Sequence, residues 1–132
     1  MIHISDALSL AFHSMAAMYK ADGKPISARE IAVTTHVSQA HLAKVLQKLA
    51  LVGLAVATRG PAGGYRLARP GGKITLGEVY AAVEGAVPDN HCVVHRSGGE
   101  CPFGRCIFRG LLPKLTSDVT DYLNHQTVAD LV

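Results

Sequence analysis

Two short helices, each opened by a serine, limit what residues 27–51 can fold into. Ser27 and Glu30 have the spacing of a capping box, in which the serine hydroxyl accepts the backbone N–H of Glu30 and the carboxylate reaches back. Ser38 is placed to cap the second helix, whose buried face carries four apolar residues at helical spacing: Leu42, Val45, Leu46 and Leu49. Because about four residues separate the two helices, they predict a helix-turn-helix.

A β-hairpin is predicted directly after the second helix. Gly53 ends that helix, and residues 54–58 and 64–68 alternate apolar and polar positions around the Gly/Pro turn at 59–63. A hairpin in this place is the wing of a winged helix-turn-helix. The expected fold is therefore mainly α with a small β-hairpin wing, and the expected DNA-binding domain covers residues 1–85.

Three further helices are predicted outside this segment. Ser5 is a plausible cap for a helix whose one face carries Leu8, Phe12, Met15 and Tyr19. Thr75 and Glu78 repeat the capping-box spacing and open a helix that ends at Glu84, before Gly85.

The last predicted helix covers residues 107–125 and has an apolar stripe of Leu111, Leu115, Val119 and Tyr122. Pro113 either lies in its first turn or kinks it. Such a stripe more often belongs to a core, but we assign it to a homodimer interface, because the chain has few other ways to build the two-fold symmetry that a reader of duplex DNA prefers. Residues 107–132 are accordingly expected to form a dimerisation helix and tail.

Positive charge is concentrated between Lys24 and Lys73, where eight basic residues face Glu30 alone, whereas the rest of the chain carries a net charge of −4. A solvated basic face is the simpler interpretation of charge alone, but here the charge coincides with a predicted helix-turn-helix. Glutamine can bond adenine bidentately, and lysine can reach guanine or phosphate. The candidate DNA-binding residues are Ser38, Gln39, His41 and Lys44 on the second helix and Arg59, Gly60, Tyr65 and Arg66 on the wing.

All three cysteines of the chain, Cys92, Cys101 and Cys106, lie in one Gly-rich loop at residues 86–106. An odd number cannot pair completely within one chain, and three thiolates suit a metal centre that lacks one protein ligand. Since no apolar run is long enough to span a membrane and no signal peptide is evident, we expect a cytoplasmic protein without a membrane partner. Disulfides are the less expected use of cysteine in that compartment.

The motifs together resemble the Rrf2 family of winged-helix regulators, typified by the iron–sulfur cluster regulator and the nitric-oxide-sensing repressor. The match spans nearly the whole chain. Its most distinctive part is the wing, with Arg59-Gly60 followed by Gly63-Gly64-Tyr65, and it also includes Ile31-Ala32, Ile74-Thr75-Leu76, Val83-Glu84-Gly85, the three cysteines and 128–131.

The resemblance implies a homodimer that binds a double-stranded DNA operator of two-fold symmetry. It also implies a [2Fe–2S] or [4Fe–4S] iron–sulfur cluster on Cys92, Cys101 and Cys106. One branch of the family supplies a histidine as fourth ligand, but Arg109 occupies the matching position here. Another branch uses a carboxylate from the partner's N-terminal helix, and the matching residue is Asp6. His3, His91 and His95 are the competing candidates.

Three function classes therefore remain. The first is a transcription regulator controlled by an iron–sulfur cluster. The second is a related regulator without a cluster, whose cysteines bind zinc or react as thiols, although the Cys-x-x-Cys spacing typical of zinc sites is absent. The third is a small iron–sulfur electron carrier. An enzyme is least expected, because neither a nucleophile–base pair nor paired carboxylates stand out.

Overall fold

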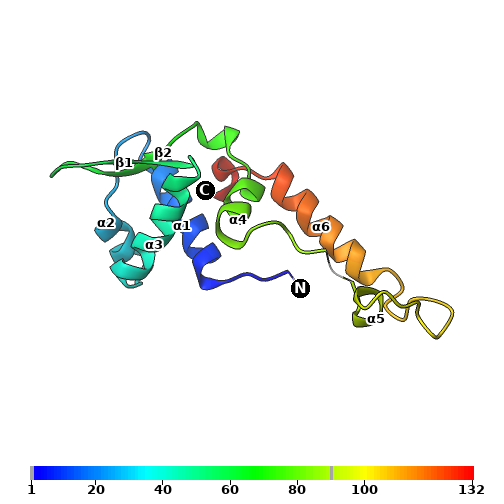
Figure 1. Cartoon of the computed structure of the whole chain (residues 1–132). Helices are drawn as coiled ribbons and strands as arrows, with labels where there is room; N and C mark the ends of the chain where they lie inside the picture. Colours follow the sequence, from blue (N-terminus) through cyan, green and yellow to red (C-terminus); the bar gives the residue numbers. More distant parts are fainter. Residues whose placement is uncertain (1, 90) are drawn as a thin grey trace.

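Helices form most of the structure, a computed structural model that describes residues 2–89 and 91–132. The elements in chain order are α1 (Asp6–Lys20), α2 (Ala28–Thr35), α3 (Gln39–Leu51), β1 (Ala55–Thr58), β2 (Gly64–Leu67), the 3-10 turn η1 (Gly71–Lys73), α4 (Leu76–Glu84), α5 (Val93–Arg96), α6 (Leu111–His125) and the 3-10 turn η2 (Val128–Leu131). Figure 1 shows α1 to α4 and the hairpin gathered in one body, from which α6 extends. The expected mainly α fold with a β-hairpin wing is confirmed.

The predicted caps start the helices of the N-terminal half of the chain. The backbone N–H of Glu30 donates to Ser27 Oγ at 3.1 Å, and Glu30 Oε2 accepts the N–H of Ser27 at 2.7 Å. Ser38 Oγ accepts the N–H of His41 at 3.1 Å. Between the two helices the chain turns at His36, which has a left-handed backbone with φ of 56°. These local bonds fix where α2 and α3 begin, as the sequence predicts.

The core forms where α1 packs against α3, α4 and the strand β2. The expected buried face of α3 is confirmed, since Leu42, Val45, Leu46 and Leu49 are all buried. On α1, Leu8 and Met15 are fully buried, but Tyr19 is 38% exposed. Its ring lies instead against Gly71, at the surface end of α1. The predicted face of α1 thus runs from the buried Leu8 and Met15 to Tyr19, which is partly exposed at the end of the helix.

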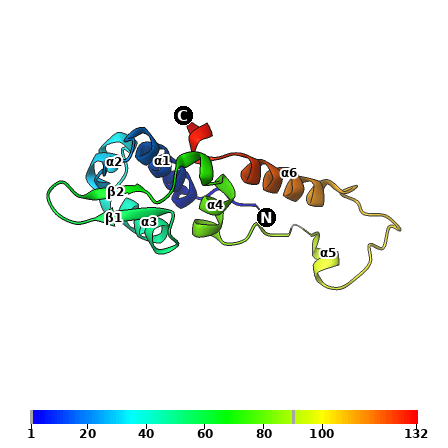
Figure 2. The same cartoon turned by 90° about the horizontal axis from the view of Figure 1, so that it is seen from above.

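The C-terminal segment returns to the N-terminal body and is hydrogen-bonded to it. The N–H of Leu76 donates to the carbonyl of Gln126 at 2.9 Å, and the N–H of Val128 donates to the carbonyl of Ile74 at 2.9 Å. Val128 is fully buried, and Leu123 of α6 packs with Leu76 and Tyr80 in a second apolar cluster. The C-terminal end of α6 is thereby anchored, while its N-terminal end extends away from the body (Figures 1 and 2).

Two predictions about the C-terminal part of the chain need correction. The last helix begins at Leu111 rather than at residue 107, because Arg109 and Gly110 adopt left-handed backbones with φ of 50° and 81°. Pro113 then lies in the first turn, where its missing N–H has no intrahelical acceptor in any case. The segment predicted as a loop contains one turn of helix, α5. None of the helices described is both long and apolar enough to cross a membrane.

Candidate nucleic-acid interface and cysteine loop

The exposed side of α3 carries the predicted reading residues. Gln39, His41 and Lys44 are exposed at its N-terminal end, on the side away from the buried leucines. Ser38 is also exposed, but its oxygen already accepts the N–H of His41 as the helix cap. The arrangement leaves the first turns of α3 open to a major groove, which is the approach used by recognition helices.

The wing presents Arg59 and Gly60 at its turn. Both residues are exposed, and the turn is closed by the N–H of Gly63, which donates to the Gly60 carbonyl at 3.0 Å. Among the described residues, the Arg59 side chain makes no hydrogen bond or ion pair. Its guanidinium is therefore available to a phosphate or a narrow minor groove.

Tyr65 and Arg66 lie differently from what the sequence suggests. The Tyr65 side chain is partly buried and packs against the main core, so its ring is not presented to solvent as Arg59 is. Arg66 is exposed on the other face of β2, where it lines a surface groove with Lys20 and Arg69. Arg59 and Gly60 thus share the wing turn, whereas Arg66 lines this groove and Tyr65 supports the hairpin from the core side.

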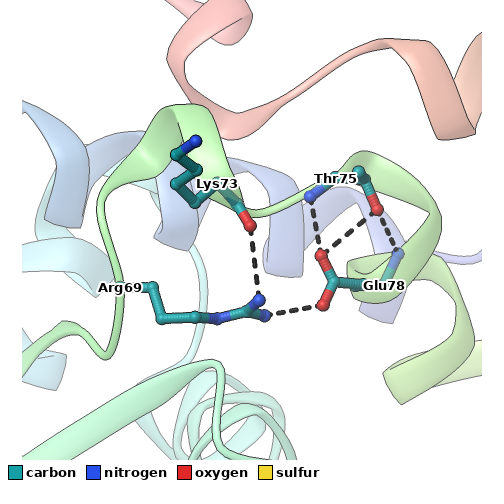
Figure 3. Close-up of polar contacts among 4 residues, drawn as sticks. All are labelled: Arg69, Lys73, Thr75 and Glu78. Carbon is teal, nitrogen blue, oxygen red and sulfur yellow. Dashed lines mark hydrogen bonds and ion pairs between the residues drawn. The ribbon is translucent and has the colours of Figure 1, made fainter.

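Arg69, which contributes to the basic segment, is held by other parts of the fold (Figure 3). Its Nη2 donates to Glu78 Oε1 at 2.6 Å, and its Nη1 donates to the carbonyl of Lys73 at 3.3 Å. The hydrogen bond from Arg69 is the main reason that the pKa of Glu78 is lowered. The other oxygen of Glu78 accepts the N–H of Thr75 at 2.9 Å and completes the capping box of α4. Sequence reasoning missed this pair, because nothing local links residues 69 and 78.

The three cysteines lie in a segment with little support from the rest of the fold. Cys92 and Cys101 are partly buried, Cys106 is exposed, and all three thiols are free. Backbone hydrogen bonds described for residues 91–110 join positions no more than five apart in sequence. Figures 1 and 2 both place α5 and the neighbouring loop at the far end of α6 from the wing.

The predicted metal ligands are not brought together in the described part of the chain, which contains no group of three or more His, Cys, Asp or Glu side chains positioned to hold a metal. His91 and His95, which lie on either side of Cys92 in the sequence, have ring centroids 4.7 Å apart with the ring planes tilted by 38°, and His91 Nε2 lies 3.0 Å from Asp89 Oδ2. His3 is exposed near the N-terminus. The donor set suits iron–sulfur chemistry, and binding would require the loop to close around it.

Asp6 is the exposed first residue of α1. The preceding residue fixes its place, because Ser5 Oγ accepts the N–H of Leu8 at 3.1 Å and donates to Glu84 Oε1 at the end of α4. Asp6 is thereby held near the point where the chain leaves α4 for the cysteine loop. The start of α1 and α5 are nevertheless well separated within one chain (Figures 1 and 2).

Comparison with known proteins identifies the family. The model of the Rrf2 family, described as an iron-dependent transcriptional regulator, matches residues 4–132. The chain belongs to the Rrf2 family. The HTH-type transcriptional regulator IscR of Vibrio vulnificus is 32% identical over 130 residues, which are 98% of this chain and 71% of that protein. A putative HTH-type transcriptional regulator of Haemophilus influenzae is 34% identical over 113 residues, or 85% of this chain and 73% of its own.

Solved structures agree with this assignment. CymR, the global cysteine regulator of B. subtilis, matches with a TM-score of 0.82 and 27% identity, over 99% of this chain and 96% of its own. T. potens IscR matches in fold, with a TM-score of 0.73 and 23% identity over 98% and 85% of the two chains. The predicted winged-helix fold and Rrf2 resemblance are confirmed. The protein is a DNA-binding transcription regulator, and its relatives are regulators rather than enzymes.

We predict different outcomes for two wing-side arginines. Arg59→Ala should weaken binding to every duplex and lower the slope of log affinity against log salt by about one phosphate contact, since the side chain has no described partner within the fold. Arg69→Ala should lower the melting temperature and leave that slope unchanged, because Arg69 bonds Glu78. Fluorescence anisotropy over a salt series measures both slopes. An Arg59→Ala slope equal to that of the parent would contradict the assignment of Arg59 to a DNA phosphate.

Proposed function

We propose that this regulator holds an iron–sulfur cluster on Cys92, Cys101 and Cys106 and that the state of this loop controls operator binding. The observation that carries the proposal is the position of the cysteines. All of them lie between α4, which packs in the DNA-binding half, and α6, whose exposed stripe extends beyond it. A change in the loop would therefore act on the connection between the helix-turn-helix with its wing and the proposed dimer helix α6.

The chemistry of the donors fits the group. Three free thiols provide three ligands for a [2Fe–2S] or [4Fe–4S] cluster. When bound, such a cluster supplies an iron centre that reacts with oxidants and nitric oxide. The loop can close around it at little structural expense, because its described backbone hydrogen bonds are local and do not tie it to the core.

A second copy of the chain is the proposed partner of α6. Leu111, Leu115 and Tyr122 are 50%, 44% and 61% exposed, although they form an apolar stripe, and Ile107 and Phe108 continue the exposed apolar surface toward the loop. Contiguous apolar surface of this kind marks an interaction site. We therefore propose residues 1–85 as the DNA-binding domain, 86–106 as the cluster-binding loop and 107–132 as the dimerisation segment.

The fourth ligand is proposed to be Asp6 of the second copy. Arg109 cannot serve, since a guanidinium stays protonated and has no acceptor. Asp6 is exposed and lies apart from the cysteines of its own chain, as a ligand donated to another subunit would. His3, His91 and His95 remain the alternatives, and His91 is already engaged with Asp89.

Operator contacts are proposed for the exposed residues at the two reading elements. Gln39, His41 and Lys44 would enter the major groove, with Ser38 at the start of the helix. Arg59 and Gly60 would meet the backbone or minor groove at the wing turn. Arg66 would reach phosphate from the groove side of β2, and Tyr65 would act indirectly by holding the hairpin to the core.

A cluster-free thiol regulator is the second candidate. It is favoured by two observations: the three thiols are free and at least partly accessible, and a cysteine regulator, CymR, matches over nearly the whole chain. The absorption spectrum separates the two candidates, because thiolate-ligated iron–sulfur centres absorb in the visible range and free or zinc-bound thiols do not.

We expect the protein purified without oxygen to be brown and each of Cys92→Ala, Cys101→Ala and Cys106→Ala to lose the visible absorption. The circular dichroism spectrum should remain that of the parent, since none of the three cysteines belongs to either apolar cluster. Ser97→Ala is a matched control within the same loop. Full colour in one cysteine variant would remove that cysteine from the ligand set, and a colourless parent that responds to thiol oxidants would favour the second candidate.

Cross-subunit ligation is tested with a mixed dimer that carries Asp6→Ala on one chain and Cys92→Ala on the other. If Asp6 binds across the dimer, one site keeps all its ligands and the other loses two. If Asp6 binds within its own chain, each site loses one ligand. We therefore expect about half of the parent's cluster content, with the parent's stability in air.

Iron and sulfide analysis together with the rate of bleaching in air provide the measurement. The Asp6→Ala homodimer should assemble a cluster that bleaches faster, because its iron is open to attack. A mixed dimer whose remaining cluster bleaches as fast as that of the Asp6→Ala homodimer would contradict the assignment of Asp6 across the dimer. An Asp6→Ala homodimer that bleaches like the parent would contradict Asp6 as a ligand.

A further inference from the structure

The wing is hydrogen-bonded to the chain that leads into the helix-turn-helix. β1 and β2 pair as a two-stranded antiparallel ribbon of four residues each, and Tyr65 lies opposite Ala57. On its other side Tyr65 pairs with Ile26: the N–H of Ile26 donates to the Tyr65 carbonyl at 2.9 Å, and the N–H of Tyr65 donates to the Ile26 carbonyl at 2.8 Å. A two-stranded ribbon is marginally stable alone, so this third partner stiffens it.

Ile26 directly precedes Ser27, the cap of α2. The capping box then fixes the first turn of α2, and α2 packs against α3. One continuous set of backbone bonds and packing contacts therefore runs from the wing, through Tyr65 and Ile26, to the start of the recognition helix. The wing and α3, the two elements proposed to touch DNA, are thus both positioned relative to Ile26.

The close pairing depends on Gly64. A Cβ atom at this position would lie 2.5 Å from the carbonyl carbon of Ile26 and 2.9 Å from the backbone nitrogen of Ser27. Both are backbone atoms at the capped N-terminus of α2, so neither can move without disturbing the start of that helix. By contrast, a Cβ on Gly72 would meet nothing within 4 Å.

We propose that the Ile26–Tyr65 pair, made possible by Gly64, determines operator specificity by fixing the distance between wing and recognition helix. Base readout by α3 and backbone contact by the wing must occur together on one duplex, so their separation sets the register. Non-specific attraction depends on the charges alone and survives a displaced wing. Ile26 and Gly64 are thus positioning residues. The inference rests on DNA binding and is independent of the cluster.

Ile26→Pro and Ile26→Ala form a matched pair for the test. Both remove the isoleucine side chain, but only proline removes the N–H that donates to Tyr65. A duplex first selected from random sequences by the parent protein is compared with an unrelated duplex of equal length. We expect Ile26→Pro to bind the selected duplex at least about tenfold more weakly than Ile26→Ala, with affinities for the unrelated duplex within about twofold.

Gly64→Ala, with Gly72→Ala as its control, repeats the test without touching Ile26. The same selective loss is expected for Gly64→Ala alone, and thermal unfolding checks each variant. Equal losses on both duplexes, no loss on either, or unfolding of both Ile26→Pro and Gly64→Ala would overturn the inference. If the parent selects no preferred duplex, sequence-specific DNA binding itself fails. If the parent does select a preferred duplex, but each test variant binds both duplexes as its control does, specific DNA binding stands and only the inference about the Ile26–Tyr65 pair fails.

Discussion

The packing of α1 into the core is the interaction on which the other parts of the structure depend. Its buried face, which includes Leu8 and Met15, contacts elements from both halves of the chain, namely α3, α4, β2 and η2. Its N-terminal cap, Ser5, bonds Glu84 at the end of α4. One helix, α1, therefore organises the helix-turn-helix with its wing, the start of the cysteine loop and the returning C-terminal segment. The same helix carries the proposed ligand Asp6.

Local signals predicted most of the fold. The boxes at Ser27–Glu30 and Thr75–Glu78 and the cap at Ser38 fix helix starts through bonds between residues three apart, so the sequence alone reveals them. The predictions failed where distant residues decide the outcome. The Arg69–Glu78 and Ile26–Tyr65 bonds join residues with no local relation, and neither was predicted.

Some features of the candidate site could likewise be predicted from the sequence and others could not. Exposure of Gln39, His41 and Lys44 follows directly from the apolar period of α3. Composition requires only that at least one of the three thiols is unpaired within the chain, whereas all three are free in the structure. The arrangement of the cysteines does not follow from the sequence, because their loop lacks long-range backbone bonds among its described residues. In our proposal the loop closes around a cofactor and with the help of a second chain. The sequence therefore specifies the donors, whereas in our proposal their assembly depends on partners outside the chain.

Control of DNA binding by the loop is the central claim, and it is tested by comparing two states of one protein. The affinity of the anaerobically loaded dimer for its selected duplex is measured by anisotropy, the iron is then removed with a chelator under reducing conditions, and the affinity is measured again. Coupling between two sites of this kind changes affinity by about 5- to 150-fold. We expect a change in that range that is reversed on reloading and absent in Cys101→Ala. Equal affinities of the loaded and stripped forms, at full cluster content in the loaded form, would contradict the claim.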